Sequence, residues 1–388
     1  MDGHEQGPVR PSLALLLAAT LAGPACAEEE QRAYFYHGLE YGTDSLIHPL
    51  RLVVNGGWGI MQLSSRDNHP LDVDYRQGWK NVWKNLADPG GAIQAEGWWD
   101  FLQREVIPIS FNSGKAHYWP NYTQHLLGGG MSYRMTTEWY RAHGYEHAST
   151  WSGATLMSYH LLNEVVENDD YDGWTTDPVA DVLLFDPASI LLFSNEGVCR
   201  FFGETLHMSD WSYQPMIDPW HQTLINNGQN FAMKLDLPKW EHWSLFYHYG
   251  THGELGLSRT WDDGRSLSVG AGMKADVLID ITQYHKGAEL AATAGVFYDR
   301  HNSLLASVLW ARSKDYKLRV NLYPGLFEVA GLRPGLAFNL NRNDSFAMGV
   351  NLSSAGPPLR DRRRPGTHHL EVTARREEPS PGAAAASA

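Results

Sequence analysis

The sequence has little cysteine and few basic residues. Of its 388 residues, 2 are cysteine and 31 are lysine or arginine, against 44 aspartate or glutamate. If the chain is cleaved after Ala27, only Cys199 remains, which excludes an internal disulfide and a cysteine-ligated metal cluster. The formal net charge is -13, and the one basic cluster, residues 360–364, lies in a proline-rich tail. A nucleic-acid partner is therefore not expected, because binding phosphate needs a basic surface.

Long apolar runs are also missing. After residue 27, no stretch is long and apolar enough to form a transmembrane helix, so a membrane-spanning form of this chain would have to be a closed β-barrel. Residues 13–21 form only a short apolar core, followed by the triplet Ala25-Cys26-Ala27. This pattern is typical of a secretory signal cleaved after Ala27. The alternative, a lipid anchor on Cys26, is disfavoured by Gly23, which stands where a leucine-like residue is needed.

What the sequence does have is a strict alternation in residues 266–282. The odd positions from Leu267 to Ile281 are all apolar, and the even positions are small, polar or charged except for Leu278. A period of two predicts a β-strand with one face in an apolar medium. Similar segments from about residue 229 to about residue 352 predict eight or nine strands in a meander, enough to close a small barrel. Soluble barrels show the same alternation with the two faces reversed.

The middle of the chain predicts helices, from about Thr123 to His143 and from about Thr150 to Glu167. Asp186-Pro187, like the earlier Asp177-Pro178, matches an N-cap followed by the first helical residue, so a further helix is expected to begin at each pair. The predicted fold class is α+β: a helical periplasmic part followed by a C-terminal antiparallel β-barrel of about eight strands. The predicted regions are a signal peptide (1–27), a mixed N-terminal segment (28–110), a helical domain (111–227), a β-barrel domain (228–354) and a disordered tail (355–388).

The strongest set of polar residues lies in this helical middle. We expect His125, Glu164 and Asp181 to converge as candidate catalytic residues, since a histidine between carboxylates can perform acid–base chemistry. His160, Glu164 and Glu167 follow one helical face and are the candidate ligands of a divalent metal, the candidate cofactor. The alternative is purely structural: His160 and Glu164 form a buried pair that holds helices in register, and Glu167 is solvated.

Three short motifs carry a resemblance to a known family. They are Pro-Asn-Tyr-Thr-Gln-His-Leu-Leu-Gly-Gly at 120–129, Glu164-x-x-Glu167 and Thr-Asp-x-x-x-Asp at 176–181. Their order resembles a family of uncharacterised bacterial envelope proteins that pair a helical part with a β-rich rear half. The resemblance covers about residues 75–225. It implies an envelope location, this architecture and the importance of His125, Glu164, Glu167 and Asp181, but no activity.

A fainter similarity is to VanZ-like membrane proteins, which also order a histidine, a glutamate and an aspartate on successive helices. The helices of this chain lack the continuous apolar length of those proteins, so no membrane-helix role carries over. The function that the sequence predicts is that of an exported, outer-membrane-associated protein with a structural, transport-accessory or lipid-contacting role, whose partner is outer-membrane lipid. The alternatives are an envelope hydrolase acting on lipid or cell-wall material through His125, Glu164 and Asp181, and a soluble periplasmic ligand-binding barrel.

Overall fold

The computed structural model describes residues 32–63, 68–107, 120–282, 285–313, 316–341 and 345–351. All of them belong to one unit of the chain, Met1–Ser353. The predicted signal peptide (1–27) and the predicted disordered tail (355–388) lie outside the described residues.

Helices dominate the first half of the described chain and begin well before the predicted helical domain. The helical segments are η1 (Asp44–Leu46), α2 (Pro49–Gly57), η2 (Gly59–Gln62), α3 (Tyr75–Ala87), α4 (Pro89–Glu96), α5 (Trp98–Phe101), η3 (Leu102–Val106), η5 (Asn121–Gly129), α7 (Gly130–Ala142), α8 (Ala148–Glu167), α9 (Asp177–Ala180), η6 (Asp181–Phe185), α10 (Asp186–Phe193), α11 (Glu196–Arg200) and η7 (Phe201–Thr205). Much of the mixed segment 28–110 is therefore helical.

Several of these segments are π-helical, namely η3, η5, η6 and η7. A π-helical N–H bonds to the carbonyl five residues back, so each turn holds one residue more than an α-helical turn. Segment η6 joins α9 to α10, and residues 177–193 form one continuous helical run. An α-helix, α10, does begin at Asp186 as predicted, but Asp186 is its first residue and not an N-cap, because the chain enters it from η6. Pro187 lies inside this run, where its missing N–H and its ring are accommodated directly after the wider π-turn.

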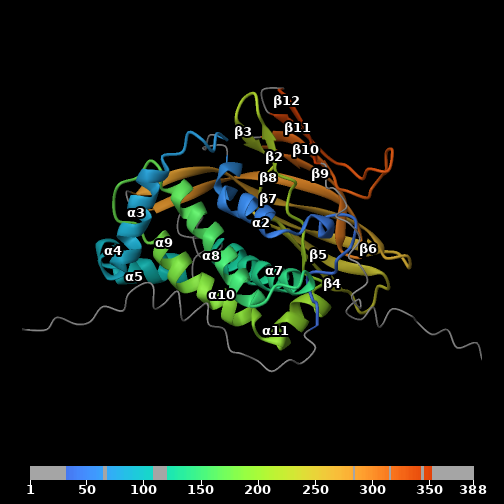
Figure 1. The fold of residues 1–388 in the computed structure, drawn as a ribbon, viewed down its shortest axis with the longest axis horizontal. Coiled ribbons are helices and arrows are strands. Elements are labelled where there is room, and N and C mark those ends of the chain that lie inside the picture. Colours follow the sequence, from blue (N-terminus) through green and yellow to red (C-terminus); the bar gives the residue numbers. More distant parts are fainter. Residues whose placement is uncertain are drawn as a thin grey trace, which may run out of the picture. The chain divides into compact units, whose positions relative to one another are not determined.

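The second half forms an open antiparallel sheet. Ten strands pair in the order β1-β4-β5-β6-β7-β8-β9-β10-β11-β12, and β2 pairs with β3 in a separate small sheet. The strands are β1 (Ser209–Asp210), β2 (Met216–Asp218), β3 (Thr223–Ile225), β4 (Phe231–Asp236), β5 (Trp243–Tyr249), β6 (His252–Thr260), β7 (Arg265–Thr282), β8 (His285–Arg300), β9 (Ser303–Ala311), β10 (Tyr316–Leu322), β11 (Gly335–Asn341) and β12 (Phe346–Asn351). The α+β class is thus confirmed. A closed barrel of about eight strands is not: among the described residues, β1 and β12 are edges of a curled sheet (Figure 1).

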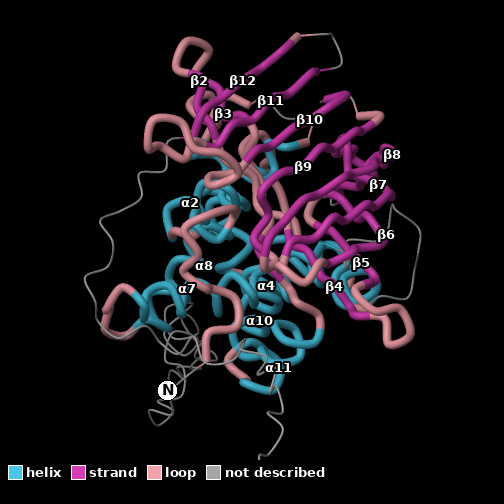
Figure 2. The backbone as a smooth tube through the Cα atoms, turned by 90° about the vertical axis from the view of Figure 1, so that its right-hand side faces the viewer, coloured by secondary structure: helices cyan, strands magenta, loops and turns pink. Residues whose placement is uncertain are grey.

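Helices cover one face of this sheet (Figure 2). Met131 of α7, Tyr159 of α8 and Phe193 of α10 share a buried core with Phe231 of β4 and Tyr249 of β5. Farther along the sheet, a second core forms around Trp211, Phe246 and Phe297 and contains no residue of α7, α8 or α10. The helices that carry the predicted site residues therefore pack against the β4–β5 end of the sheet.

Candidate functional site

The uncovered face of the sheet is apolar, while the covered face buries polar side chains beside the apolar core around Phe246 and Phe297. On β7, Val269 is 51% exposed, and Leu267 and Met273 are exposed to a similar extent, while Lys274 is fully buried at 0% and Ser268 is equally buried. A water-soluble sheet with one covered face shows the opposite arrangement, with apolar residues against the core and polar residues in water. The alternation that the sequence predicts is therefore present, and its apolar side is the uncovered one.

This arrangement extends across the whole sheet. Residues paired directly across neighbouring strands from β4 to β12 form an unbroken apolar row: Leu235, Leu245, Leu257, Val269, Val296, Val308, Val320, Phe338 and Met348. None of these residues is buried. We call this surface, together with its exposed neighbours Leu255, Leu267, Met273, Leu290, Trp310, Leu318, Phe346 and Val350, the apolar sheet face.

The covered side of the same strands carries paired polar and charged groups. Lys234 Nζ donates to Asp299 Oδ2 at 2.7 Å, and both side chains are buried. His248 Nδ1 lies 2.8 Å from Glu254 Oε2, also with both side chains buried. Farther along, the buried residues Lys274, Asp276, Arg319, Asn321 and Asn339 continue this polar lining. Burying charges in this way is favourable only when they find partners, and the two pairs measured here meet that condition.

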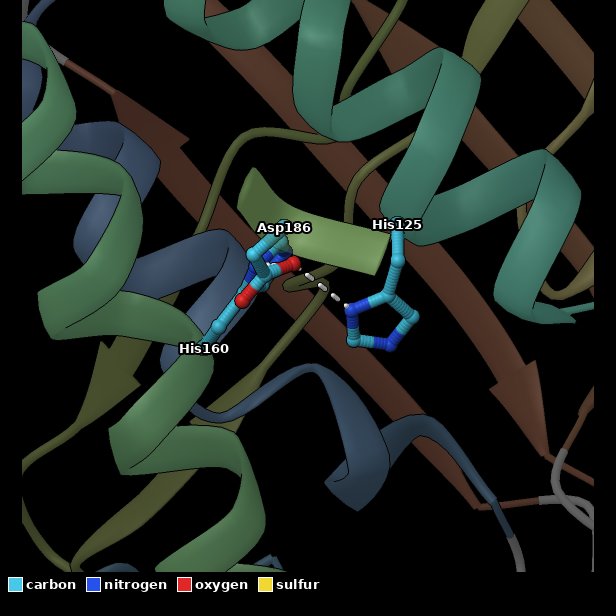
Figure 3. Close-up of side chains that lie close together, drawn as sticks. All are labelled: His125, His160 and Asp186. Carbon is cyan, nitrogen blue, oxygen red and sulfur yellow. Dashed lines mark hydrogen bonds and ion pairs between the residues drawn. The ribbon is translucent and has the colours of Figure 1, made fainter. Parts of the chain in front are cut away.

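A separate candidate site lies among the helices. His125 of η5, His160 of α8 and Asp186 of α10 place their side chains together (Figure 3). The Nδ1 atom of His125 is 3.2 Å from Asp186 Oδ1, and the Nδ1 atom of His160 is 2.5 Å from the same oxygen. The two imidazole rings lie 4.5 Å apart between centroids. One carboxylate oxygen is thus shared by two histidines from two different helices.

Further carboxylates surround these three residues, which we call the histidine–aspartate cluster. The second nitrogen of His125, Nε2, lies 3.2 Å from Asp181 Oδ2. Glu164 and Glu105 are buried, and Asn121 donates to Glu105 Oε2 at 2.9 Å. His125 is therefore held between two aspartates, one at each ring nitrogen, and buried acidic groups adjoin it.

Burial and charge move the pKa values of this region in different directions. Burial raises the pKa of Asp181 well above its usual range, and the negative charges of Glu164, Asp177 and Glu105 raise it further. For Asp186, burial also raises the pKa, but His160 and His125 lower it more, so the net pKa is below its usual value. Burial lowers the pKa of His160 despite the charge of Asp186. The folded protein thus favours an ionised Asp186 beside a neutral His160.

A glycine allows the helices to come this close. A Cβ atom on Gly129 would lie only 3.2 Å from Cε1 of His160 and 3.5 Å from the hydroxyl of Ser189. Helix α8 can therefore bring His160 against η5 because position 129 has no side chain. Gly129 follows His125 by four residues, so the close approach lies one helical turn from the first histidine of the site.

The structure brings some of the predicted site residues together. Of the predicted catalytic set, His125 contacts Asp181, and Glu164 is close enough for its charge to raise the pKa of Asp181. Of the predicted metal set, only His160 belongs to the group of potential ligand atoms that lie within 4.8 Å of one another. The other members of that group are His125 and Asp186, not Glu164 and Glu167. Glu167 is half-buried on the last turn of α8.

Two residues of this region are not singled out by the sequence patterns. Asp186 reads as an N-cap because Pro187 follows it, yet its carboxylate faces both histidines. Glu105 lies in η3, just before residues 108–119, which the structure does not describe. One signal could have found Asp186: its spacing of five from Asp181, which places both carboxylates on one side of a π-turn.

Comparisons with protein-family models, with curated proteins and with solved structures gave no match to this chain. Within the described residues, no single helix has the length and hydropathy to cross a membrane. Segments Asp177–Phe193 and Glu196–Thr205 meet those criteria only as a pair, and they are bent by 81° relative to each other.

Proposed function

We propose that this chain is an exported protein of the bacterial outer membrane whose apolar sheet face contacts lipid. Its role there is structural, transport-accessory or lipid-contacting, as the sequence predicts. The observation that carries the proposal is the inverted sheet: the row from Leu235 to Met348 is uncovered, while Lys234, Asp299 and other charged groups are buried behind it.

Burial energetics favour a lipid environment for this face. Moving apolar surface from water into an apolar medium is favourable by about 25 cal/mol per Å². Soluble monomers rarely expose apolar patches larger than roughly a few hundred Å², whereas this face spans nine neighbouring strands. Acyl chains would provide that medium. A soluble ligand-binding barrel, the alternative predicted from the sequence, would have its polar residues outside and its apolar residues inside.

Tryptophan placement also supports lipid contact. A tilted transmembrane strand needs about 9–11 residues; the central strands β6 and β9 have 9 and β7 has 18, while the outer strands β4, β5, β10, β11 and β12 have 6 or 7. Trp240, Trp243 and Trp261 are exposed at one end of the sheet, at the β4–β5 and β6–β7 turns. Tryptophan is favoured at the boundary between lipid and water.

Closure of the sheet is part of this proposal. In lipid, every backbone N–H and C=O needs a partner, so an open sheet edge is unfavourable. The edges at β1 and β12 would therefore need hydrogen-bonding partners in the membrane.

The test is a pair of substitutions on β7, Val269→Arg and Met273→Arg. Near the bilayer midplane, an arginine on the lipid side should destabilise the membrane form by about 2–4 kcal/mol. We expect both variants to lose outer-membrane fractionation and heat-modifiable gel mobility. The matched control is Leu71→Arg, because Leu71 is 72% exposed but lies in the loop before α3 and not on a strand. Wild-type membrane assembly of both β7 variants would overturn the proposal.

A second candidate function, an envelope hydrolase, is favoured by the position of His125 between Asp181 and Asp186. A carboxylate at one ring nitrogen orients a histidine so that its other nitrogen can move a proton. The test compares hydrolysis of phospholipid and of peptidoglycan by the wild type and by folded His125→Asn and Asp181→Asn variants. Equal rates in all three proteins would remove this candidate.

A further inference from the structure

Three potential metal ligands from three helical segments meet in the histidine–aspartate cluster. One ring nitrogen of His125, one ring nitrogen of His160 and a carboxylate oxygen of Asp186 all lie within 4.8 Å of one another, and all three residues are buried. We propose that these residues bind one divalent transition-metal ion, with Zn²⁺ as the probe. This inference goes beyond the proposed lipid contact and does not depend on it.

The donor set determines which class of metal fits. Two imidazole nitrogens and one carboxylate oxygen suit Zn²⁺ and other late first-row dications, which bind such ligands at about 2.0–2.2 Å. Ca²⁺ prefers six to eight oxygen ligands and Mg²⁺ an octahedron of oxygens, and two of the three donors here are nitrogen. Zn²⁺ stands above Mn²⁺ and Fe²⁺ in the general order of affinity and has no redox chemistry of its own, so it is the probe of choice.

An unpartnered carboxylate oxygen supplies a second observation. Within the described residues, Asp186 Oδ2 is a buried atom that forms no hydrogen bond. The other oxygen of this carboxylate, Oδ1, already faces both histidines. Buried polar atoms in native proteins nearly always have a partner, and those without one need an explanation. A cation held by the lone pairs of these ligands provides it.

The surroundings of His125 resemble the outer part of a metal site. A histidine that binds a metal through one nitrogen commonly donates from the other to a carboxylate, which fixes the ring and raises its basicity. Here Nδ1 of His125 faces the cluster and Nε2 faces Asp181 at 3.2 Å. Asp181 is thus assigned as a positioning residue.

The experiment uses the full-length protein, purified in detergent without a histidine tag and stripped with a chelator. Titration with Zn²⁺ should show one tight equivalent, and X-ray absorption at the zinc edge should show two imidazole ligands. Asp186→Asn and His160→Asn should each weaken binding by roughly 100-fold or more, and the outer variant Asp181→Asn by about 10–100-fold. The matched control is His221→Asn, which removes a histidine–aspartate pair at 2.6 Å on the protein surface and should leave the affinity unchanged.

Each result decides the proposal. A folded wild type without a stoichiometric tight site, or unchanged affinity in both Asp186→Asn and His160→Asn, overturns it. Should these variants fail to fold, the wild type decides alone: Zn²⁺ must raise its melting temperature, as a ligand specific for the folded state does, and the zinc must have two imidazole ligands. No thermal shift, or fewer than two imidazoles, overturns the assignment. Failure of the lipid-contact test leaves these measurements unaffected, so the two proposals fail separately.

Discussion

Gly129 and His160 touch across two helices, at the point where a side chain on the glycine would reach the imidazole. The adjacent Gly130 is tighter still: a Cβ there would lie 2.2 Å from the ring of Phe193. Replacing a helical glycine with alanine gains about 1 kcal/mol of helix propensity, while overpacking a filled core costs about 1–3 kcal/mol. We therefore expect Gly129→Ala to stay within about 1 kcal/mol of wild type and Gly130→Ala to be clearly less stable. Chemical denaturation measures both, and the reverse order would contradict the packing described for these glycines.

The thiol of Cys199 should be unreactive in the native protein. Its side chain is fully buried, and burial raises the pKa of the thiol to about 12, with Glu196 and Glu138 adding to the rise and Arg134 opposing it. Because the folded pKa is raised, the folded state keeps its proton longer than the unfolded state. The buried neutral thiol therefore contributes fully to the free energy of unfolding below the unfolded thiol pKa of about 8.5. This contribution is lost as the pH rises from that value towards 12.

Two measurements check this prediction. Iodoacetamide at pH 8 should label the chain in denaturant but not in its native state. The loss of stability between pH 8.5 and higher values should be smaller in Cys199→Ala than in the wild type. Rapid native labelling would show that the thiol is accessible.

The buried pair Lys234–Asp299 links β4 to β8 on the covered side of the sheet. Lys234 Nζ also lies 3.2 Å from Asn302 Oδ1, so the ammonium has two oxygen partners. Removing one member of a buried ion pair leaves an uncompensated charge and typically costs about 3–5 kcal/mol. We expect Asp299→Asn or Lys234→Met alone to destabilise by about this amount, and the double variant Lys234→Met/Asp299→Leu to be milder than either. Equal or additive losses, measured by denaturation, would show that the two charges are not coupled.

Lipid contact at the sheet end can be read from tryptophan fluorescence. In vesicles containing brominated acyl chains, Trp310 of the apolar sheet face should be quenched, and so should Trp240, Trp243 and Trp261 beside that face. Replacing these four with phenylalanine should remove most of the quenching. Trp79 and Trp83, which are about half exposed and stacked on α3, are the matched control, and replacing them should leave the quenching unchanged. If replacing Trp79 and Trp83 removed the quenching instead, lipid would contact α3 and not the apolar sheet face.

The sheet was predictable from sequence because its alternation is local. Residues 266–282 predict β7, and the Asp262-Asp263-Gly264 turn, with Gly264 at a φ of +77°, lies where the pattern indicates. The direction in which the apolar side faces was not predictable, because it depends on where distant helices pack. Phe231 and Tyr249 meet the helical core, and no spacing within the strands encodes that contact.

The helical cluster was less predictable because its geometry departs from the ordinary helical period. At 100° per residue, Asp181 and Asp186 would lie roughly 140° apart around an α-helix, so helical spacing separates them. The π-turn from Asp181 to Phe185 brings them to the same histidine. Regular helical spacing also predicted the wrong partner for His160. Glu164 lies four residues from His160 on one helical face, yet Asp186, from another helix, contacts His160.

The wide turn before Asp186 also bears on how this cluster could arise or disappear during evolution. A π-turn differs from an α-turn by a single inserted residue. Deleting one residue from η6, such as the exposed Leu184, would restore regular helix and rotate every downstream side chain by about 100°. Asp186 would then turn away from both histidines without any ligand being substituted. A relative that has lost the cluster would be recognised by a one-residue gap in this segment, even where His125, His160 and the aspartate are all retained.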